Sequence, residues 1–313
     1  MNSQDLEAIT PARPEAGHGA TTLTVTIVIP AYNRAEALKR TLAAVTPAVS
    51  PAVEVMVVDD CSATAEVEAA CALYAGRVRY VRTPRNSGVI GARNYAYGMA
   101  EGDIIVNLDD DSHFKSVDIL DRSIAEFARN PRLGIIAYNI ETPAGLGLSA
   151  DAEPFRCYTY TGCGNAIRRS AMLQAGLLSP YFWRQGEEIE HTLRVYDAGY
   201  EAFTYPDMIV EHEESPINRD PRAHTSYHAA NYLKRVALLY PMSTIPVGVA
   251  RWLGFLVKHR KSMSLSQVFR ELGRRDRGLA AALRDRRPVS AATFREVQNI
   301  KRIEALIRAR NAA

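Results

Sequence analysis

The sequence of 313 residues has few cysteines and no long apolar run. Its four cysteines form no CxxC pair and no metal-ligand spacing with histidines, so we expect buried reduced thiols. The most apolar window, residues 242–257, is interrupted by proline, glycine and arginine and is shorter than the roughly 20 apolar residues of a spanning helix. We favour a packed helix there. Because the basic residues 258–261 (KHRK) follow, the alternative is an interfacial segment that rests on a membrane.

An apolar core is also absent from the N-terminal segment. Residues 1–22 are polar, rich in Ala, Pro, Gly and Thr, and without periodicity. This composition predicts a disordered leader and no signal peptide. A cytoplasmic location is then the default expectation, with a peripheral position at the inner face of the membrane left open.

Glycine-rich phosphate loops are missing as well. The segment after the first predicted strand reads PAYNRAE, where a dinucleotide-binding fold would carry GxGxxG, and no GxxxxGK[ST] occurs anywhere. The sequence therefore argues against a dinucleotide-dependent oxidoreductase and against a P-loop nucleotidase.

Charge is small overall but unevenly distributed. The formal net charge is +3, which favours no nucleic-acid partner. From Arg251 onward the chain has 16 Lys and Arg against 5 Asp and Glu. This basic region is either a solvated helical face or a surface that contacts an anionic membrane.

Strands and helices alternate from residue 25 onward. Strands are predicted at 25–30, 53–58, 78–82, 103–108 and 134–139, and helices at 35–45, 65–75, 90–101, from about Val117 to 129, and 187–198. Extended segments follow at 201–205 and 208–211. This alternation predicts an α/β fold with a mostly parallel sheet covered on both faces. We expect a leader at 1–22, an α/β domain at 23–221 and a helical basic region at 222–313.

Five sequence segments stand in a characteristic order. They are TIVIPAYNRAEALKRTL (26–42), VMVVDDCSAT (55–64), NSGVIGARNYA (86–96), VNLDDDS (106–112), and Gly-Glu-Glu at 186–188 followed by Arg194 and Gly199. Together they resemble the family-2 inverting glycosyltransferases, which have the Rossmann-like GT-A fold.

The resemblance implies an enzyme that moves a sugar from a nucleotide-diphosphate sugar, most simply one of UDP or dTDP, to an acceptor hydroxyl. The acceptor would be a glycan, a lipid-linked molecule or a small molecule, and the sequence does not select among them. A catalytically inactive module of the same fold that binds sugar nucleotides or glycans is the alternative. The oligomeric state is not predicted.

Three adjacent carboxylates end the fourth predicted strand. Asp109, Asp110 and Asp111 repel one another, so a divalent cation such as Mg²⁺ or Mn²⁺ is expected to neutralise them. The resemblance maps an Asp-x-Asp metal motif onto Asp109 and Asp111 and suggests His212 as a third ligand. The alternatives are a solvated acidic turn and a merely hydrogen-bonded histidine.

Polar residues also follow the first two strands, where ligands bind in parallel sheets. The expected nucleotide-binding residues are Pro30, Ala31, Tyr32, Asn33, Arg34, Asp59, Asp60, Asn86, Gly88, Arg93, Asp109 and Asp110. A carboxylate of Asp59 or Asp60 would accept a hydrogen bond from the base. Helix capping by Asp60 and a local ion pair of Arg93 are the alternatives.

An inverting transfer needs a base for the acceptor hydroxyl, and a carboxylate suffices. The resemblance places the base at Glu188, where the family usually has Asp, and Glu187 is the second candidate. Electrostatic support of a helix start is the alternative for both. For the sugar and acceptor side, the expected residues are Gly162, Cys163, Gly164, Asn165 and Trp183. A tight turn and a core tryptophan are the alternatives there.

Overall fold

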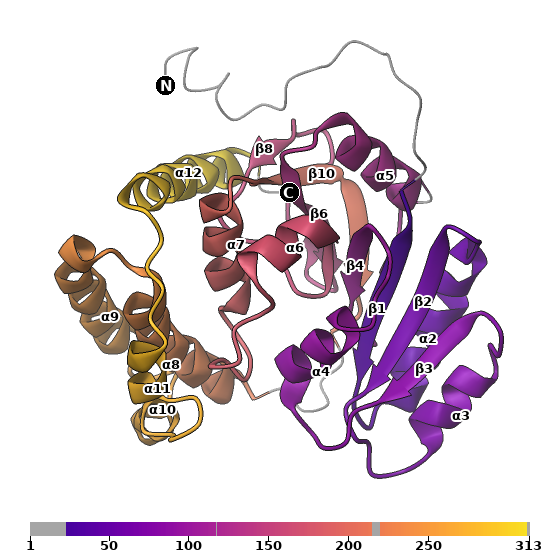
Figure 1. Cartoon of the computed structure of the whole chain (residues 1–313), viewed down its shortest axis with the longest axis horizontal. Helices are drawn as coiled ribbons and strands as arrows, with labels where there is room; N and C mark the ends of the chain where they lie inside the picture. The colour runs from indigo at the N-terminus through magenta and orange to yellow at the C-terminus, as the bar shows by residue number, and fades with distance from the viewer. Residues whose placement is uncertain (1–22, 117, 215–219, 312–313) are drawn as a thin grey trace.

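The computed structural model describes residues 23–116, 118–214 and 220–311 (Figure 1). The predicted leader at 1–22 and the predicted helix start at Val117 lie outside these residues. Within the described ranges the chain forms a ten-stranded sheet with helices on both faces, followed by a group of C-terminal helices. The α/β class expected from the alternation of strands and helices is therefore confirmed.

The sheet is parallel at its N-terminal side and mixed beyond it. Its strands run in the order β3-β2-β1-β4-β9-β6-β10-β5, with β7 beside β6 and β8 beside β10. The strands are β1 (Val25–Ala31), β2 (Val53–Asp59), β3 (Val78–Arg82), β4 (Ile104–Leu108), β5 (Ser112–Phe114), β6 (Leu133–Thr142), β7 (Gly145–Leu146), β8 (Phe155–Arg156), β9 (Gly164–Arg168) and β10 (Glu201–His212). Strand β9 is antiparallel to both β4 and β6, so it separates the two parallel parts.

Successive residues of the central strands point to opposite faces and build two cores. Ile27 and Ile29 of β1 pack towards α2 (Ala35–Val45), α3 (Glu66–Ala72) and α5 (Ile119–Arg129). Val28 packs towards α4 (Gly88–Tyr97), α6 (Arg169–Ala175) and α7 (Glu187–Asp197) on the other face. Both faces of β1 are buried, which explains why its sequence is a continuous apolar run.

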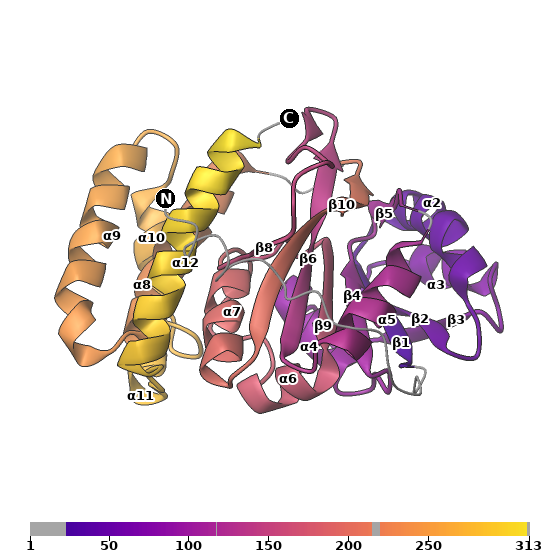
Figure 2. The same ribbon diagram turned by 90° about the horizontal axis from the view of Figure 1, so that it is seen from above.

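The C-terminal helices continue the second core. They are α8 (Pro221–Leu239), α9 (Ile245–His259), α10 (Leu265–Leu272), α11 (Leu279–Arg284) and α12 (Ala291–Arg310), with short 3₁₀ turns at Thr46–Ala48 and Met242–Thr244. Val236 of α8 and Phe294 and Ile300 of α12 belong to the same apolar cluster as Val28. Figure 2 shows these helices gathered beyond α7, at the end of the sheet away from β3. The helical region is thus joined to the α/β domain through a shared core.

Two stretches differ from their predicted form. The extended segments predicted at 201–205 and 208–211 are one strand, β10, whose register on β6 shifts between Tyr205 and Ile209. Pro206 has no amide hydrogen to donate at this shift, which explains the apparent break in the sequence pattern. The region 150–169, for which no strand was predicted, contains β8 and β9.

Candidate active site

The acidic turn lies where β4 ends and β5 begins. Asp109 is partly exposed, whereas Asp110 and Asp111 are buried. The hydroxyl of Ser112 accepts a 2.7 Å hydrogen bond from the Asp109 amide and donates to the carbonyl of Cys163 at 2.9 Å. These bonds fix the turn against the loop that precedes β9. The three carboxylates are therefore held at the carboxyl end of β4, as predicted.

Arginines neutralise this turn in the structure. Arg34 Nη1 lies 2.7 Å from Asp110 Oδ1, and the same guanidinium also pairs with Asp111. Arg93 Nη2 lies 2.6 Å from Asp109 Oδ1. Two guanidinium groups therefore supply positive charge to the turn, and the divalent cation expected from the sequence would compete with them.

Burial and pairing act differently on the buried carboxylates. Burial raises the pKa of Asp110 well above its usual range, against the charge of Arg34. Burial would also raise the pKa of Asp111, but hydrogen bonds from His212 and Arg34 outweigh it and hold that pKa low. Asp111 is thus the member of the pair kept as an anion.

Side chains that suit a divalent cation converge beside the turn. Ligand atoms of Asp109, Cys163 and His212 lie within 4.8 Å of one another, and His212 Nε2 is 3.2 Å from Asp111 Oδ1. His212 reaches this place because β10 pairs with β5, which sets His212 opposite Ser112. Carboxylate and imidazole donors fit Mg²⁺ or Mn²⁺, and the thiol adds a softer donor. The residues present therefore fit a cation, in competition with the two arginines.

Cys163 was not expected among these donors. The sequence interpretation assigned it to the sugar or acceptor side, on the basis of the Gly-Cys-Gly-Asn stretch. The sequence spacing between Cys163 and the histidines does not indicate a metal site. The possible ligands come from the end of β4, from β10 and from the turn before β9, which meet only in the folded sheet.

The aspartates that end β2 are both engaged by the protein. Asp59 is fully buried and accepts hydrogen bonds from Ser62 N at 2.8 Å, Tyr80 at 2.8 Å and Arg82 at 2.6 Å. Asp60 accepts from the amides of Ser87 at 2.9 Å and Gly88 at 2.8 Å. Asp60 therefore caps the start of α4, whereas the alternative from sequence had it capping the helix directly after β2.

The segment after β1 borders the same edge. Pro30 and Ala31 are the last residues of β1, and Tyr32 is exposed. Asn33 adopts a left-handed backbone (φ 54°) and bridges to the loop after β2, since its side-chain oxygen accepts from Ala63 N at 2.7 Å. Together with Asn86, which is exposed near the start of α4, these residues line one edge of the sheet as predicted.

Glu187 and Glu188 begin α7, after Gly186 in a left-handed conformation (φ 83°). Burial raises the pKa of both glutamates, and the charge of Glu188 adds to the shift at Glu187. Arg93 is the cation beside them. Its pKa is raised although burial opposes its charge, because Asp109, Glu187 and Glu188 favour the charged form.

Gly162 shows how closely these groups approach. A Cβ atom there would lie 2.8 Å from Arg93 Nη1 and 3.4 Å from Glu188 Oε1. Arg93 also donates to the Gly162 carbonyl at 2.8 Å. One guanidinium therefore connects the acidic turn, the turn before β9 and the surroundings of Glu188.

Three residues expected on the sugar or acceptor side make contacts with other parts of the protein. Asn165 is fully buried and its amide donates to the carbonyls of Thr161 (2.9 Å) and Gly162 (3.2 Å), so it holds the turn. Gly164 packs against Ile140, where a Cβ atom has no room. The Trp183 indole lies against Gly88 and has Arg277 over its ring, 4.6 Å from the ring centre.

Helix α8 supports the loop before α7, which sequence reasoning did not find. Asn231 Nδ2 donates to the carbonyls of Arg184 (2.8 Å) and Gln185 (2.7 Å). The fully buried Lys234 donates to the Tyr181 carbonyl at 3.0 Å. No motif marks these two side chains, because their role appears only when α8 packs against the loop.

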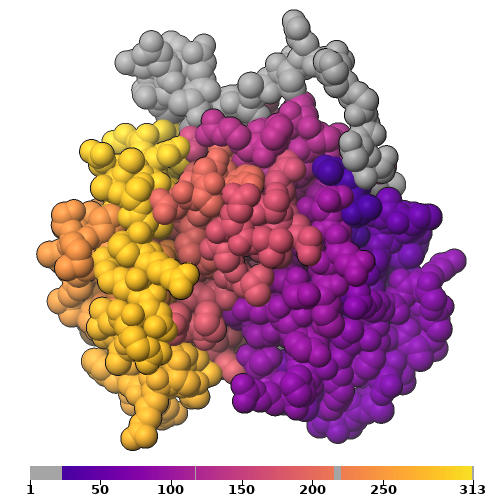
Figure 3. Space-filling model, in the orientation of Figure 1, coloured from indigo at the N-terminus to yellow at the C-terminus, as the bar shows by residue number. Residues whose placement is uncertain are grey.

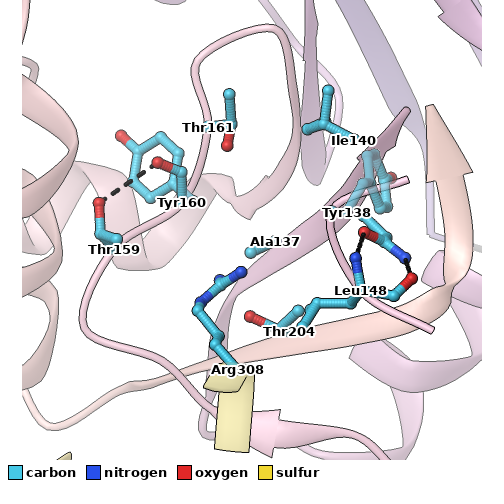
Figure 4. Close-up of a pocket in the computed structure, with 11 residues that line it drawn as sticks. Ala137, Tyr138, Ile140, Leu148, Thr159, Tyr160, Thr161, Thr204 and Arg308 are labelled. Atoms are coloured by element: carbon cyan, nitrogen blue, oxygen red, sulfur yellow. Dashed lines mark hydrogen bonds between the residues drawn. The ribbon is translucent and has the colours of Figure 1, made fainter. Parts of the chain in front are cut away.

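A small pocket of about 180 Å³ lies beside the turn before β9 (Figure 4). It is bounded by the end of β6, by Tyr160 and Thr161, and by Arg308 of α12, which reaches in from the C-terminal region. Ligand pockets are usually about 300–1,000 Å³. This pocket is therefore too small for a sugar nucleotide.

Solved structures with the same architecture are glycosyltransferases, so the GT-A fold is confirmed. Residues 1–349 of S. aureus TarS in complex with UDP-GlcNAc give a TM-score of 0.61 at 14% identity, covering 92% of this chain and 93% of that one. The mannosyltransferase PcManGT from Pyrobaculum calidifontis, in complex with GDP-Man and Mn²⁺, gives 0.56 at 17% identity, covering 92% and 84%. Likeness at this level of identity establishes the fold alone.

Sequence comparison gives the family. Residues 26–144 match the family described as Glycosyl transferase family 2. The succinoglycan biosynthesis protein ExoO of Rhizobium meliloti (strain 1021) is 42% identical over 87 residues, covering 28% of this chain and 25% of that protein. The matched range contains the first four of the five segments, and it is similar to the family that those segments resemble. It spans between 25% and 60% of the length of the curated relatives it matches.

Proposed function

We propose that this protein transfers a sugar from a nucleotide-diphosphate sugar to an acceptor hydroxyl, with inversion at the anomeric carbon. The nucleotide lies along the carboxyl ends of β1, β2 and β4, with UDP or dTDP as the first nucleotides to test. The family match and the complexes of TarS with UDP-GlcNAc and of PcManGT with GDP-Man support this class of donor.

One observation carries the proposal. Arg93 is buried and contacts Asp109 at the metal-diphosphate side, while Glu188 lies near the same guanidinium. The group that takes a proton and the group that stabilises the leaving diphosphate are thus within one cluster. An inverting displacement needs both groups, one on each side of the anomeric carbon.

Glu188 is the proposed base. Its carboxylate takes the proton of the acceptor hydroxyl as that oxygen bonds to the anomeric carbon, and the nucleoside diphosphate leaves with the electron pair of the broken bond. A pKa raised by burial makes Glu188 a better proton acceptor than an exposed glutamate.

Asp109 and His212 belong to one cluster of possible ligands, and Asp111 Oδ1 lies 3.2 Å from His212 Nε2. These three residues would hold Mg²⁺ or Mn²⁺, which supplies positive charge to the departing diphosphate when bound. Arg34 and Arg93 now pair with these aspartates. Both arginines are also expected to bind the donor, so a diphosphate offers them a second anion and releases the carboxylates. Cation binding is therefore tighter with nucleotide than without it.

The two glutamates give a matched test. We expect Glu188→Gln to abolish transfer while UDP affinity by titration calorimetry is retained, because a base acts on the chemical step. Glu187→Gln is the control at the adjacent position. Loss of activity in Glu187→Gln alone would assign the base to that residue instead.

A binding module without catalysis is the second candidate, because paired arginines on the acidic turn are also compatible with a site that only binds. A donor-hydrolysis assay with UDP and dTDP sugars and Mn²⁺ separates the two. Nucleotide binding without any donor turnover, across a panel of sugars, would favour the binding module.

We also propose that α9 rests on an anionic membrane. Among the described residues no helix is long and apolar enough to span a bilayer. Helix α9 nevertheless exposes Val247, Leu253 and Val257, and positions 221–270 contain no Asp or Glu. An apolar stripe with basic neighbours suits the interface of a bilayer with anionic lipids.

Vesicle sedimentation tests this contact. The protein is expected to bind phosphatidylglycerol vesicles, and Leu253→Glu with Val257→Glu should abolish binding. Leu173→Glu, at an exposed leucine of α6, is the control. Equal binding by the α9 variant would exclude this helix as the contact.

A further inference from the structure

A pocket lies between the start of α4 and the C-terminal helices. Its volume is about 880 Å³, within the range of ligand-binding pockets. Asn86 and Gly91 line one side of the pocket. The other lining residues include Trp183, in the loop before α7, and Arg270 and Arg274, around the end of α10. In Figure 3 the surface is hollowed along its lower edge, between the yellow C-terminal segment and the purple segment that contains α4.

Positive charge dominates the pocket wall. Four arginines line it, against two acidic side chains, Glu271 and Asp276. The arginines are Arg85, Arg270, Arg274 and Arg277. Lys234 lies close behind Glu271, and its burial lowers the pKa of that lysine to about 8. The wall therefore has more cations than its own carboxylates can neutralise.

The pairing of these arginines is incomplete. Arg274 Nε donates a long hydrogen bond of 3.4 Å to Asp276 Oδ1. Arg277 Nε lies 3.7 Å from Glu271 Oε2, which is beyond hydrogen-bond distance. Both atoms of the second pair are buried and have no hydrogen-bond partner among the described residues. Arg85 and Arg270 form no ion pair with another described residue. The exposed guanidinium groups of Arg85 and Arg270 thus remain available to an anionic ligand, to which they can donate charge-assisted hydrogen bonds.

The pocket adjoins the proposed reaction centre. Trp183 lines it and stands five positions before Glu188, in the loop that leads into α7. Gly88 touches the indole of Trp183, and its amide donates to Asp60 at the nucleotide edge. A molecule in this pocket is thus placed next to the start of α4 at the nucleotide edge and beside the loop that leads to Glu188.

We propose that this pocket binds the acceptor, and that the acceptor carries a phosphate or phosphodiester group held by Arg270 with Arg85 and Arg274. This inference rests on the proposed function and narrows the acceptor to anionic molecules. A diphosphate-linked lipid and a phosphorylated glycan share this chemistry.

The test uses two probes, geranyl diphosphate and glucose 6-phosphate, with glucose as the neutral comparison. Binding is measured by titration calorimetry on the full chain with saturating UDP and Mn²⁺, so that the nucleotide site is filled. At least one phosphate probe is expected to bind, and glucose is not. The preferred probe tells whether the phosphate is that of a lipid or of a sugar.

Arg270→Ala is expected to lower the affinity for the preferred probe by between about tenfold and a hundredfold, since a charge-assisted hydrogen bond is lost. Arg275→Ala is the matched control, because Arg275 is exposed in the same segment and does not line the pocket. Thermal unfolding of both variants checks that each is folded.

Three results would overturn the proposal. They are no binding of either phosphate probe, equal weakening by both alanine variants, and complete displacement of the probes by UDP. A wild-type protein that fails to bind UDP would refute the proposed function separately, and the probes would then be titrated without nucleotide to test the pocket itself.

Discussion

The contact between Gly88 and Trp183 gives a quantitative prediction for Gly88→Ala. Gly88 has φ +74°, a backbone conformation that costs an alanine about 1–2 kcal/mol. The new methyl group would lie 3.0–3.2 Å from three indole carbons of Trp183, and crowding of this kind costs about 1–3 kcal/mol. We therefore expect the free energy of unfolding to fall by about 2–5 kcal/mol.

Gly199→Ala separates the two contributions. Gly199 has φ +87°, but a Cβ atom there meets no heavy atom within 4 Å. Its substitution should therefore cost the backbone strain alone, about 1–2 kcal/mol. Urea unfolding followed by circular dichroism gives both values, and their difference measures the crowding against Trp183.

A double-mutant cycle with Trp183→Ala completes the experiment. Removing the indole should relieve the crowding, so that Gly88→Ala in the Trp183→Ala background costs no more than Gly199→Ala. If Gly88→Ala and Gly199→Ala cost the same in the wild-type background, the indole moves aside freely. The view of a fixed contact between α4 and the loop before α7 would then be refuted.

Four further predictions concern the proposed site. The acid limb of kcat/KM against pH should lie above the ordinary glutamate pKa of about 4.3, because burial raises the pKa of Glu188; a limb at or below that value would exclude it as the base. Glu187 also has a raised pKa in the folded state, so its contribution to stability is complete below about pH 4.3 and is lost as the pH rises through the raised value. Glu187→Gln should therefore stabilise the protein at pH 8 and not at pH 4, as measured by urea unfolding, and a gain independent of pH would contradict this. Asp111→Asn should abolish Mn²⁺-dependent turnover, and full activity of this variant would count against Asp111 as a metal ligand. Cys163→Ser should keep turnover but remove the near-ultraviolet sulfur-to-metal band of bound Co²⁺. A wild-type protein without that band would count against Cys163 as a metal ligand.

Much of the fold could be predicted because the parallel strands are buried on both faces. Strand β1 shows this as a continuous apolar run in the sequence. Strand β9 could not be predicted in the same way. Its five residues, Gly164–Arg168, have little strand preference of their own, and the strand forms because β4 and β6 pair with it on both sides.

The site was predictable to the extent that strand ends determine it. Asp60 and Asp109 follow β2 and β4, two parallel strands on either side of β1, so their approach to one edge follows from topology. The ion-pair partners of these side chains could not be predicted from the topology. Arg34 and Arg93 lie on different segments from Asp109 and Asp111, and their pairing depends on how α4 and the loop after β1 pack. The local sequence does not determine the distances between these side chains.

The hydrogen bonds from α8 to the loop before α7 restrict how this protein can be re-engineered. Chimaeras that seek a new acceptor by grafting foreign C-terminal helices would ordinarily be cut near position 221, where the α/β unit ends. Asn231 and Lys234 hold the backbone of residues 181–185, so such a cut would leave the entrance to Glu188 without its brace. A graft that begins after Leu239 keeps that brace and exchanges only the outer helices.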